Sequence, residues 1–300
     1  MARLSTLFFG LFTYTIMLGA FLYLFGFVAN FLVPKGVDGE STVSLGLSVL
    51  INLALIAAFA LPHSVMARPG FKRWWTRFVP ETIERTVYVL VSTLLTVFLF
   101  WQWQPMGQVI WQVDAGWAQV LLWSLYVLGI VILLASTFVI NHFDLFGLRQ
   151  AVLAWQKKPY TNLGFKVTYF YKFVRHPLYV GWLMIFWCTP TMTAGHLLLA
   201  LGMSAYILIA VRFEERDLVA YHGEAYARYK SRVPMLIPNP GKVHETITSG
   251  LIDEVGYVAG ADWIHFLCRS RTANSDQTVC ASPTVNRANI LGCCTSVNER

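Results

Sequence analysis

The chain has 300 residues, of which 56% are hydrophobic, 15% aromatic and only 13% charged, and its mean hydropathy is +0.53. Charged residues make up about a quarter of an ordinary soluble domain, so this composition leaves too little polar surface for a protein surrounded by water and favours one that lies in a bilayer. The formal net charge of +7 is read as positive charge in cytoplasmic loops, and nucleic-acid binding is not expected.

Five uncharged stretches are long enough to cross the hydrocarbon core, which takes about 20 apolar residues per helix. They are residues 4–34, 41–67, 86–113, 115–141 and 177–211. The first is too long for a signal peptide and lacks a small-residue cleavage site, so we expect a permanent span. The last is interrupted around Pro190 and Gly195, which predicts two helices joined by a short turn, the first beginning near Val167. The expected fold is all-α, a polytopic membrane bundle of five to six transmembrane helices with a C-terminal helical hairpin.

The loops between these stretches differ in charge. Residues 68–85 carry five Lys and Arg and residues 149–175 carry six, whereas the alternate loops carry Lys35 with two acids, Asp114 alone, and no charge near Pro190. Because Lys and Arg accumulate in cytoplasmic loops, both basic loops are expected inside. Both termini are then cytoplasmic and the protein lies in the cell (inner) membrane; a shallow hairpin in place of the last two crossings gives the same orientation.

The composition changes after Gly241. Residues 242–300 are rich in Ser, Thr, Asn and Val and show no sustained helical period. We expect a membrane domain over residues 1–241 and a polar tail of unknown role over residues 242–300; the alternative, a cytoplasmic module, has no chemical signature. The cysteines are odd in number and lack C-x-x-C spacing, which indicates neither a disulfide framework nor a zinc site. They are Cys188, Cys268, Cys280, Cys293 and Cys294.

Familiar catalytic signatures are absent from the sequence. It has no Gly-rich dinucleotide fingerprint after a strand, no phosphate-binding G-x-x-x-x-G-K-[ST], no H-E-x-x-H and no G-x-S-x-G. The seven histidines include no pair three or four residues apart, as one helical face would need to hold a metal. We therefore expect no metal site, although the pattern leaves open ligands drawn from different helices.

One concentration of polar residues, N-H-F-D-L-F-G-L-R-Q at residues 141–150, follows the fourth span. Histidine exchanges a proton near neutral pH, and a nearby carboxylate can fix its tautomer. The run therefore predicts a catalytic site of His142, Asp144 and Arg149, with His142, helped by Asp144, as the base. The same residues are also typical of a polar helix end with a cytoplasmic arginine.

Two further polar segments flank the C-terminal hairpin. Arg175 and His176 precede its first helix, and Glu214 and Glu215 lie near the end of its second. The turn between the helices brings these ends side by side, so the basic pair is expected to face the acidic pair. Such a pocket offers cations to a carboxylate and acids to amino or hydroxyl groups, which suits a zwitterionic cofactor. Each segment alone is also typical of a helix start or of solvated charges.

These segments resemble a known family. The run R-H-P-L-Y-V-G from residue 175, with Glu214 and Glu215 and the run Y-H-G-E-A-Y-A-R-Y at residues 221–229, is similar to the cofactor-binding half of the isoprenylcysteine carboxyl methyltransferase superfamily. Residues 62–72, 84–90 and 142–150 resemble its NnrU-like branch and, within that branch, the methanethiol S-methyltransferases. The resemblance covers about residues 1–240.

The resemblance implies an integral membrane enzyme that transfers the methyl group of S-adenosylmethionine to a small volatile thiol, giving dimethyl sulfide from methanethiol. It also implies cofactor-binding positions, at which Gly181 would allow close approach of the ligand. With Arg175 added on grounds of charge, these are Arg175, His176, Tyr179, Gly181, Glu214 and Glu215. Weaker candidates are His63, Ser64, Arg68 and Tyr88.

Two other functions stay open at this point. A related methyltransferase could act on a larger lipid or a prenylated cysteine, and a non-catalytic transporter or sensor would also carry polar residues within the membrane. Besides the thiol and the cofactor, the expected partners are membrane lipids, with no nucleic acid and no metal. The oligomeric state does not follow from the sequence.

Overall fold

The computed structural model describes residues 2–161, 167 and 169–239. The predicted polar tail at residues 242–300, with Cys268, Cys280, Cys293 and Cys294, lies outside them. Five described helices are long and apolar enough to cross a membrane, which confirms the predicted polytopic helical bundle. They are α1 (Ala2–Ala29), α2 (Leu45–Met66), α4 (Glu81–Gln102), α5 (Gly116–Ile140) and α9 (Ala194–His222).

Shorter elements occupy the connections between the long helices. They are α3 (Pro69–Trp75), α6 (His142–Leu145), α7 (Leu148–Trp155), the 3-10 helix η1 (Tyr169–Lys172), α8 (Pro177–Trp187) and α10 (Glu224–Arg232). Two short strands, β1 (Val109–Gln112) and β2 (Thr191–Thr193), form an antiparallel ladder, which the all-α expectation does not include. The ladder pairs backbone groups that two helix-connecting loops would otherwise leave unpaired.

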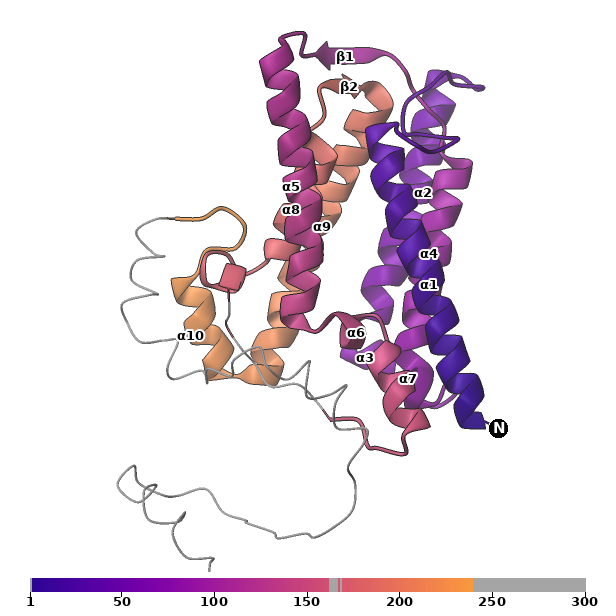
Figure 1. Ribbon diagram of the computed structural model, residues 1–300, viewed down its shortest axis with the longest axis vertical. Helices are drawn as coiled ribbons and strands as arrows, with labels where there is room; N and C mark the ends of the chain where they lie inside the picture. Colours follow the sequence, from indigo (N-terminus) through magenta and orange to yellow (C-terminus); the bar gives the residue numbers. More distant parts are fainter. Residues whose placement is uncertain (1, 162–166, 168, 240–300) are drawn as a thin grey trace, which may run out of the picture. The chain divides into compact units, whose positions relative to one another are not determined.

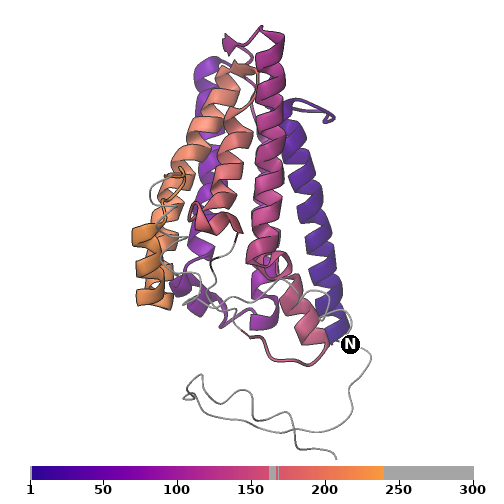
Figure 2. The same ribbon diagram turned by 60° about the vertical axis from the view of Figure 1, so that its left-hand side comes forward.

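The long helices run side by side (Figures 1 and 2). Helix α1 packs against α4, α2 packs against α4 and α9, and α5 packs against α8. The β1–β2 ladder lies at one end of the bundle, and α3, α6 and α7 lie at the other (Figure 1). The start of α1 and helix α10 are both at the end that holds α7.

Helix α8 is the first helix of the predicted C-terminal hairpin, and it is short. Its 11 residues rise about 16 Å, roughly half the thickness of the hydrocarbon core. The expected start near Val167 is wrong, because Pro177 occupies the first position of the helix and a proline disfavours helical conformation in the residue before it. The chain from Arg175 to α8 therefore enters partway along the bundle, beside α9.

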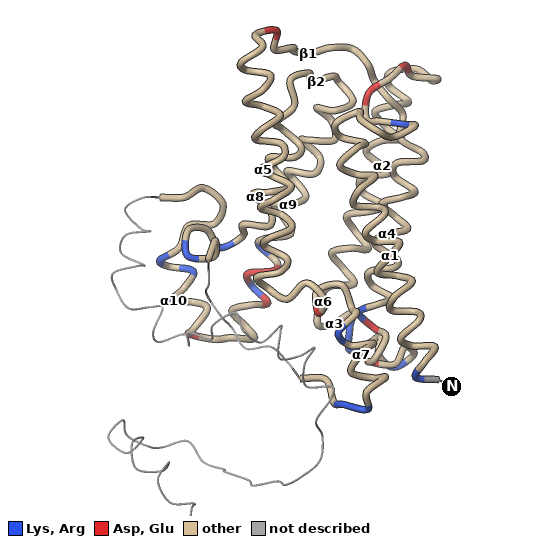
Figure 3. Tube along the Cα trace, in the orientation of Figure 1, with Lys and Arg blue, Asp and Glu red and all other residues tan. Residues whose placement is uncertain are grey.

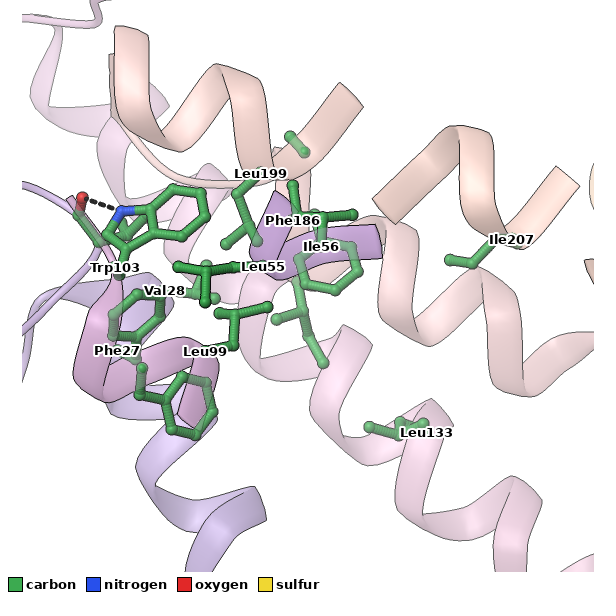
Figure 4. Close-up of a cluster of buried hydrophobic side chains, with 14 of the residues drawn as sticks. Phe27, Val28, Leu55, Ile56, Leu99, Trp103, Leu133, Phe186, Leu199 and Ile207 are labelled. Carbon is green, nitrogen blue, oxygen red and sulfur yellow. Dashed lines mark hydrogen bonds between the residues drawn. The ribbon is translucent and has the colours of Figure 1, made fainter. Parts of the chain in front are cut away.

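Apolar side chains fill the space between the long helices. Figure 4 shows a cluster in which Phe27 and Val28 of α1 meet Leu99 of α4 and Leu199 of α9. Trp103 is fully buried there, and its Nε1 donates to the carbonyl oxygen of Val37 at 3.1 Å. Large apolar side chains also cover the outside of the helices, as a bilayer permits, so packing rather than exclusion of water holds the helices together.

Charge is divided between the two ends of the bundle (Figure 3). Lys and Arg gather around α3 and α7, whereas the end with β1 carries acidic residues and Lys35. The same asymmetry in the loops carries the predicted orientation of the chain.

Candidate active site

Glu215 of α9 is the centre of an ion-pair network. Its Oε1 accepts from Nε of Arg175 at 2.7 Å and lies 3.1 Å from Nε2 of His176, and its Oε2 lies 3.0 Å from Nζ of Lys230. Glu215 is 4% exposed. Arg175 also donates to the carbonyl oxygens of Lys230 and Val233. The predicted approach of the basic pair to the acidic pair is thus observed at Glu215, where it joins the start of α8 to α9 and α10.

Glu214 has a different environment. Its Oε2 accepts from the hydroxyl of Tyr179, in the first turn of α8, at 2.8 Å. The other carboxylate oxygen accepts no hydrogen bond from the described residues, and the side chain is half-buried. Glu214 therefore has a free acceptor for a ligand, whereas both oxygens of Glu215 are taken by cationic side chains.

Gly181 lies on the face of α8 that packs against α5. A Cβ at this position would stand 2.7 Å from the carbonyl oxygen of Gly129 and 2.8 Å from the backbone nitrogen of Leu133. The absence of a side chain lets two helix backbones come close, as small residues do in membrane bundles. The close approach seen at Gly181 is between helices, and its expected close approach to a ligand stays a prediction.

A second polar cluster joins α2, α4 and α9. Nδ1 of His63 lies 3.0 Å from Oγ of Ser92, and Nε2 lies 3.1 Å from the hydroxyl of Tyr88. The ring of Tyr206 meets His63 edge-on with centroids 6.2 Å apart. At the end of the cluster, Arg68 pairs with Asp217 at 2.8 Å.

The second cluster adjoins the Glu214–Tyr179 pair. Tyr88 and Tyr206 both lie within electrostatic range of Glu214, and Tyr179 interacts in turn with both tyrosines. Helical spacing could have revealed two members that the sequence analysis omits: Ser92 is four residues after Tyr88, and Tyr206 is eight before Glu214, so each shares a helix face with its partner. Helical spacing does not predict that Asp217 or Lys230 belongs to the site, because each reaches it through a contact between residues far apart in the sequence.

His142 lies in a tight aromatic and hydroxyl environment, 3% exposed. Its Nε2 is 2.8 Å from the hydroxyl of Tyr14, and its Nδ1 is 2.7 Å from Oγ1 of Thr137. The ring stacks on Phe138 with centroids 4.3 Å apart. Burial lowers the pKa of His142 below its ordinary value of 6.5, so the imidazole is neutral at neutral pH.

Asp144 is turned away from His142. Its carboxylate pairs with Nη1 of Arg149 at 3.0 Å and accepts from Tyr160 at 3.2 Å, and no described hydrogen bond joins it to His142. Residues two apart on a one-turn helix do not face each other, and the expected assistance of His142 by Asp144 stays a prediction. Asp144 and Arg149 instead tie α6 to α7.

No group of three or more His, Cys, Asp or Glu side chains suited to a metal ion occurs within residues 2–161, 167 and 169–239. Cys188 is a free thiol in that part of the chain.

Comparison with known proteins assigns the chain to a family. A family described as "NnrU protein" matches residues 51–268. The chain belongs to the NnrU family. The match confirms the resemblance seen in the sequence, and it continues past the expected domain boundary at residue 241.

Several curated relatives of this NnrU protein are similar over nearly their whole length. The methanethiol S-methyltransferases of Mycobacterium tuberculosis and Crocosphaera subtropica are each 51% identical to it, over 80% and 81% of this chain and 98% and 95% of their own. Nurim of Mus musculus is 27% identical over 57% of this chain and 68% of its own. No solved structure matches the chain.

Proposed function

We propose that this NnrU protein is an integral membrane methyltransferase that converts methanethiol to dimethyl sulfide with S-adenosylmethionine as methyl donor. The observation that carries the proposal is the 51% identity to methanethiol S-methyltransferases across nearly their full length. The polytopic bundle and the polar cluster at the end of α9 agree with it.

The proposed cofactor site is centred on Glu214 and Tyr179. S-adenosylmethionine carries an amino group, a carboxylate and a cationic sulfonium, which supplies an electrophilic methyl group. The free oxygen of Glu214 suits one of the cationic groups. Arg175, His176 and Glu215 contribute the wall behind this site, where their mutual ion pairs fix the start of α8 against α9.

The chain's part in the reaction is to position the thiol in line with the methyl group and to keep water away. The apolar outer surface of the bundle gives a small thiol a route from the lipid. The base predicted from the sequence is His142, near Asp144 and Arg149. Hydroxyls of Tyr14 and Thr137 lie beside its two ring nitrogens, and its role as base stays a prediction.

The orientation proposed for the bundle puts both termini in the cytoplasm, in the cell (inner) membrane. The cationic end then faces the compartment that supplies the cofactor. The membrane domain is proposed to span residues 1–241, with the polar tail at residues 242–300 as an appended segment.

Headspace gas chromatography tests the proposed function. Membranes that contain the protein, given methanethiol and S-adenosylmethionine, should release dimethyl sulfide, while membranes from cells with an empty vector should not. Methylation of a prenylcysteine or another thiol with methanethiol untouched would keep the methyltransferase and overturn the substrate. Binding of S-adenosylmethionine without transfer to any thiol or lipid would overturn the enzyme itself.

A further inference from the structure

His63 is a histidine in the last turn of α2 that neither the cofactor site nor the predicted base includes. Its ring stacks on Phe59 with centroids 5.1 Å apart, and Tyr88 and Tyr206 flank it. The side chain is only half-buried, so its surface is not entirely covered by these rings. A polar ring placed within a spanning helix is costly unless it is paired or used.

The partners of Ser92 assign the tautomer of His63. Oγ of Ser92 donates its single proton to the carbonyl oxygen of Tyr88 at 2.8 Å, one turn back along α4. It can therefore only accept a hydrogen bond from Nδ1 of His63, which lies 3.0 Å away. Nδ1 then carries the ring proton, and Nε2 presents a lone pair. A neutral histidine held in one tautomer by its other nitrogen is the arrangement of a general base.

The lone pair of Nε2 lies beside the proposed cofactor site. The hydroxyl of Tyr88 is 3.1 Å from Nε2 and 3.2 Å from Nδ1, and Tyr88 interacts electrostatically with Glu214. The charged groups in electrostatic contact with His63 are Arg68, which caps the start of α3, and Arg85 from α4. Both are cations, which favour an anion bound next to the ring.

We propose that His63 is the base that removes the proton of the thiol substrate and that Tyr88 donates a hydrogen bond to the resulting sulfur anion. The proposal rests on the proposed function. The thiol proton moves to Nε2, and the Tyr88 hydroxyl, which meets Nε2 in the free protein, turns its proton to the sulfur. The thiolate then forms its bond to the methyl carbon as the carbon–sulfonium bond of the donor breaks, with that electron pair remaining on the donor sulfur. His63 finally returns its extra proton to water.

The experiment compares turnover and cofactor affinity in His63→Gln with the wild-type protein in detergent. Glutamine keeps a polar side chain of similar reach but cannot take a proton, so kcat should fall about a hundredfold or more while the Kd for S-adenosylmethionine changes less than about threefold. Raising the pH should restore part of the rate, because more thiol then arrives ionised. Tyr88→Phe should lower kcat more modestly and keep the wild-type pH profile.

Ser92→Ala has a matched control. Ser124 makes the same kind of bond to its own helix, donating to the carbonyl oxygen of Val120 at 2.7 Å, on an exposed face of α5. Ser92→Ala should reduce kcat several-fold because Nδ1 loses the partner that fixes the tautomer, whereas Ser124→Ala should leave kcat unchanged. Equal rates in Ser92→Ala and Ser124→Ala would count against the tautomer argument and overturn the proposal.

Other outcomes are equally decisive. Wild-type kcat in His63→Gln, a loss of activity that is the same at every pH, or a loss of cofactor binding would each overturn the role of His63 as base. If His63→Gln does not elute as a single folded species, Tyr88→Phe and Ser92→Ala, with their folding checked, carry the test. Failure of the wild-type protein to methylate methanethiol would overturn the proposed function instead, and the two failures are therefore distinct.

Discussion

At the scale of single residues, Glu214 and Glu215 are adjacent in the chain but have different partners. Glu215 is buried between the cationic side chains of Arg175 and Lys230, with the ring of His176 also in contact. Glu214 accepts from one neutral hydroxyl, that of Tyr179, and keeps an oxygen free among the described contacts. Consecutive residues of a helix point about 100° apart, so one glutamate can hold the fold while the other meets a ligand.

Glu215→Gln should mainly destabilise the folded protein. The change removes the charge that compensates Arg175, which is itself largely buried, and breaking a buried ion pair costs about 3 kcal/mol. Thermal unfolding in detergent should therefore show a clearly lower Tm than wild type. An unchanged Tm would mean that the network does not support the start of α8.

Glu214→Gln should mainly weaken the cofactor complex. Loss of one charge-assisted hydrogen bond costs about 1.5–3 kcal/mol, so the Kd for S-adenosylmethionine measured by calorimetry should rise at least about tenfold while the Tm of the unliganded protein stays near wild type. Tyr179→Phe, which removes only the hydroxyl that Glu214 accepts from, is the companion variant. Wild-type affinity in Glu214→Gln would exclude Glu214 from the site.

His142 should make the stability of the fold depend on pH. Burial lowers its pKa in the folded protein, so the unfolded chain binds a proton at His142 more readily, and stability falls as the pH drops through the unfolded value of about 6.5. The difference in Tm between pH 8 and pH 5.5 should be larger for wild type than for His142→Gln. Other histidines titrate in the same window, and an identical pH dependence in both proteins would contradict the prediction.

At the scale of secondary-structure elements, the contact between α5 and α8 depends on two glycines. Gly181 and Gly129 let the helices approach until a Cβ on Gly181 would overlap backbone atoms of α5. Backbone cannot yield as a flexible side chain can, so the site has no room for even a methyl group. The position of α8, and with it Tyr179 and His176, follows from this approach.

Gly181→Ala should separate α5 from α8 and destabilise the protein by about 1–3 kcal/mol, as overpacking typically does. Gly46→Ala is a suitable control, because a Cβ there meets nothing within 4 Å and alanine favours helix. Comparison of the two melting temperatures in detergent checks the prediction. A wild-type Tm for Gly181→Ala would show that the helices separate at no cost.

At the scale of the whole molecule, the division of charge between the two ends predicts orientation in the membrane. Reporter fusions after Lys35 and Asp114 should report the outside, and fusions after Lys72, Lys157 and Arg232 the cytoplasm, because the basic loops stay inside. The assay uses paired reporters that are active on opposite sides of the membrane. An external signal at Lys157 would reverse the assignment and put the proposed site on the wrong side for a cytoplasmic cofactor.

The sequence predicted most of the fold, because the length and charge of a membrane-spanning segment are local properties of the chain. It also predicted that the helix ends carrying Arg175 and Glu215 meet, since a short turn between two helices leaves little choice. It did not predict that α8 begins only at Pro177, or that β1 pairs with β2. Both features depend on contacts between segments that are separate in the sequence.

The candidate site, like the fold, was predicted only in part from the sequence. The residue types of the site and the family follow from the sequence alone, because the spacing of a motif can be read directly from the chain. Which residues touch was decided only by the tertiary structure. Asp144 turned out to pair with Arg149 and not with His142, and the bond between Arg68 and Asp217 joins residues 149 positions apart. Such contacts depend on how neighbouring helices pack against one another, and no periodicity within one helix encodes the face that its neighbour presents.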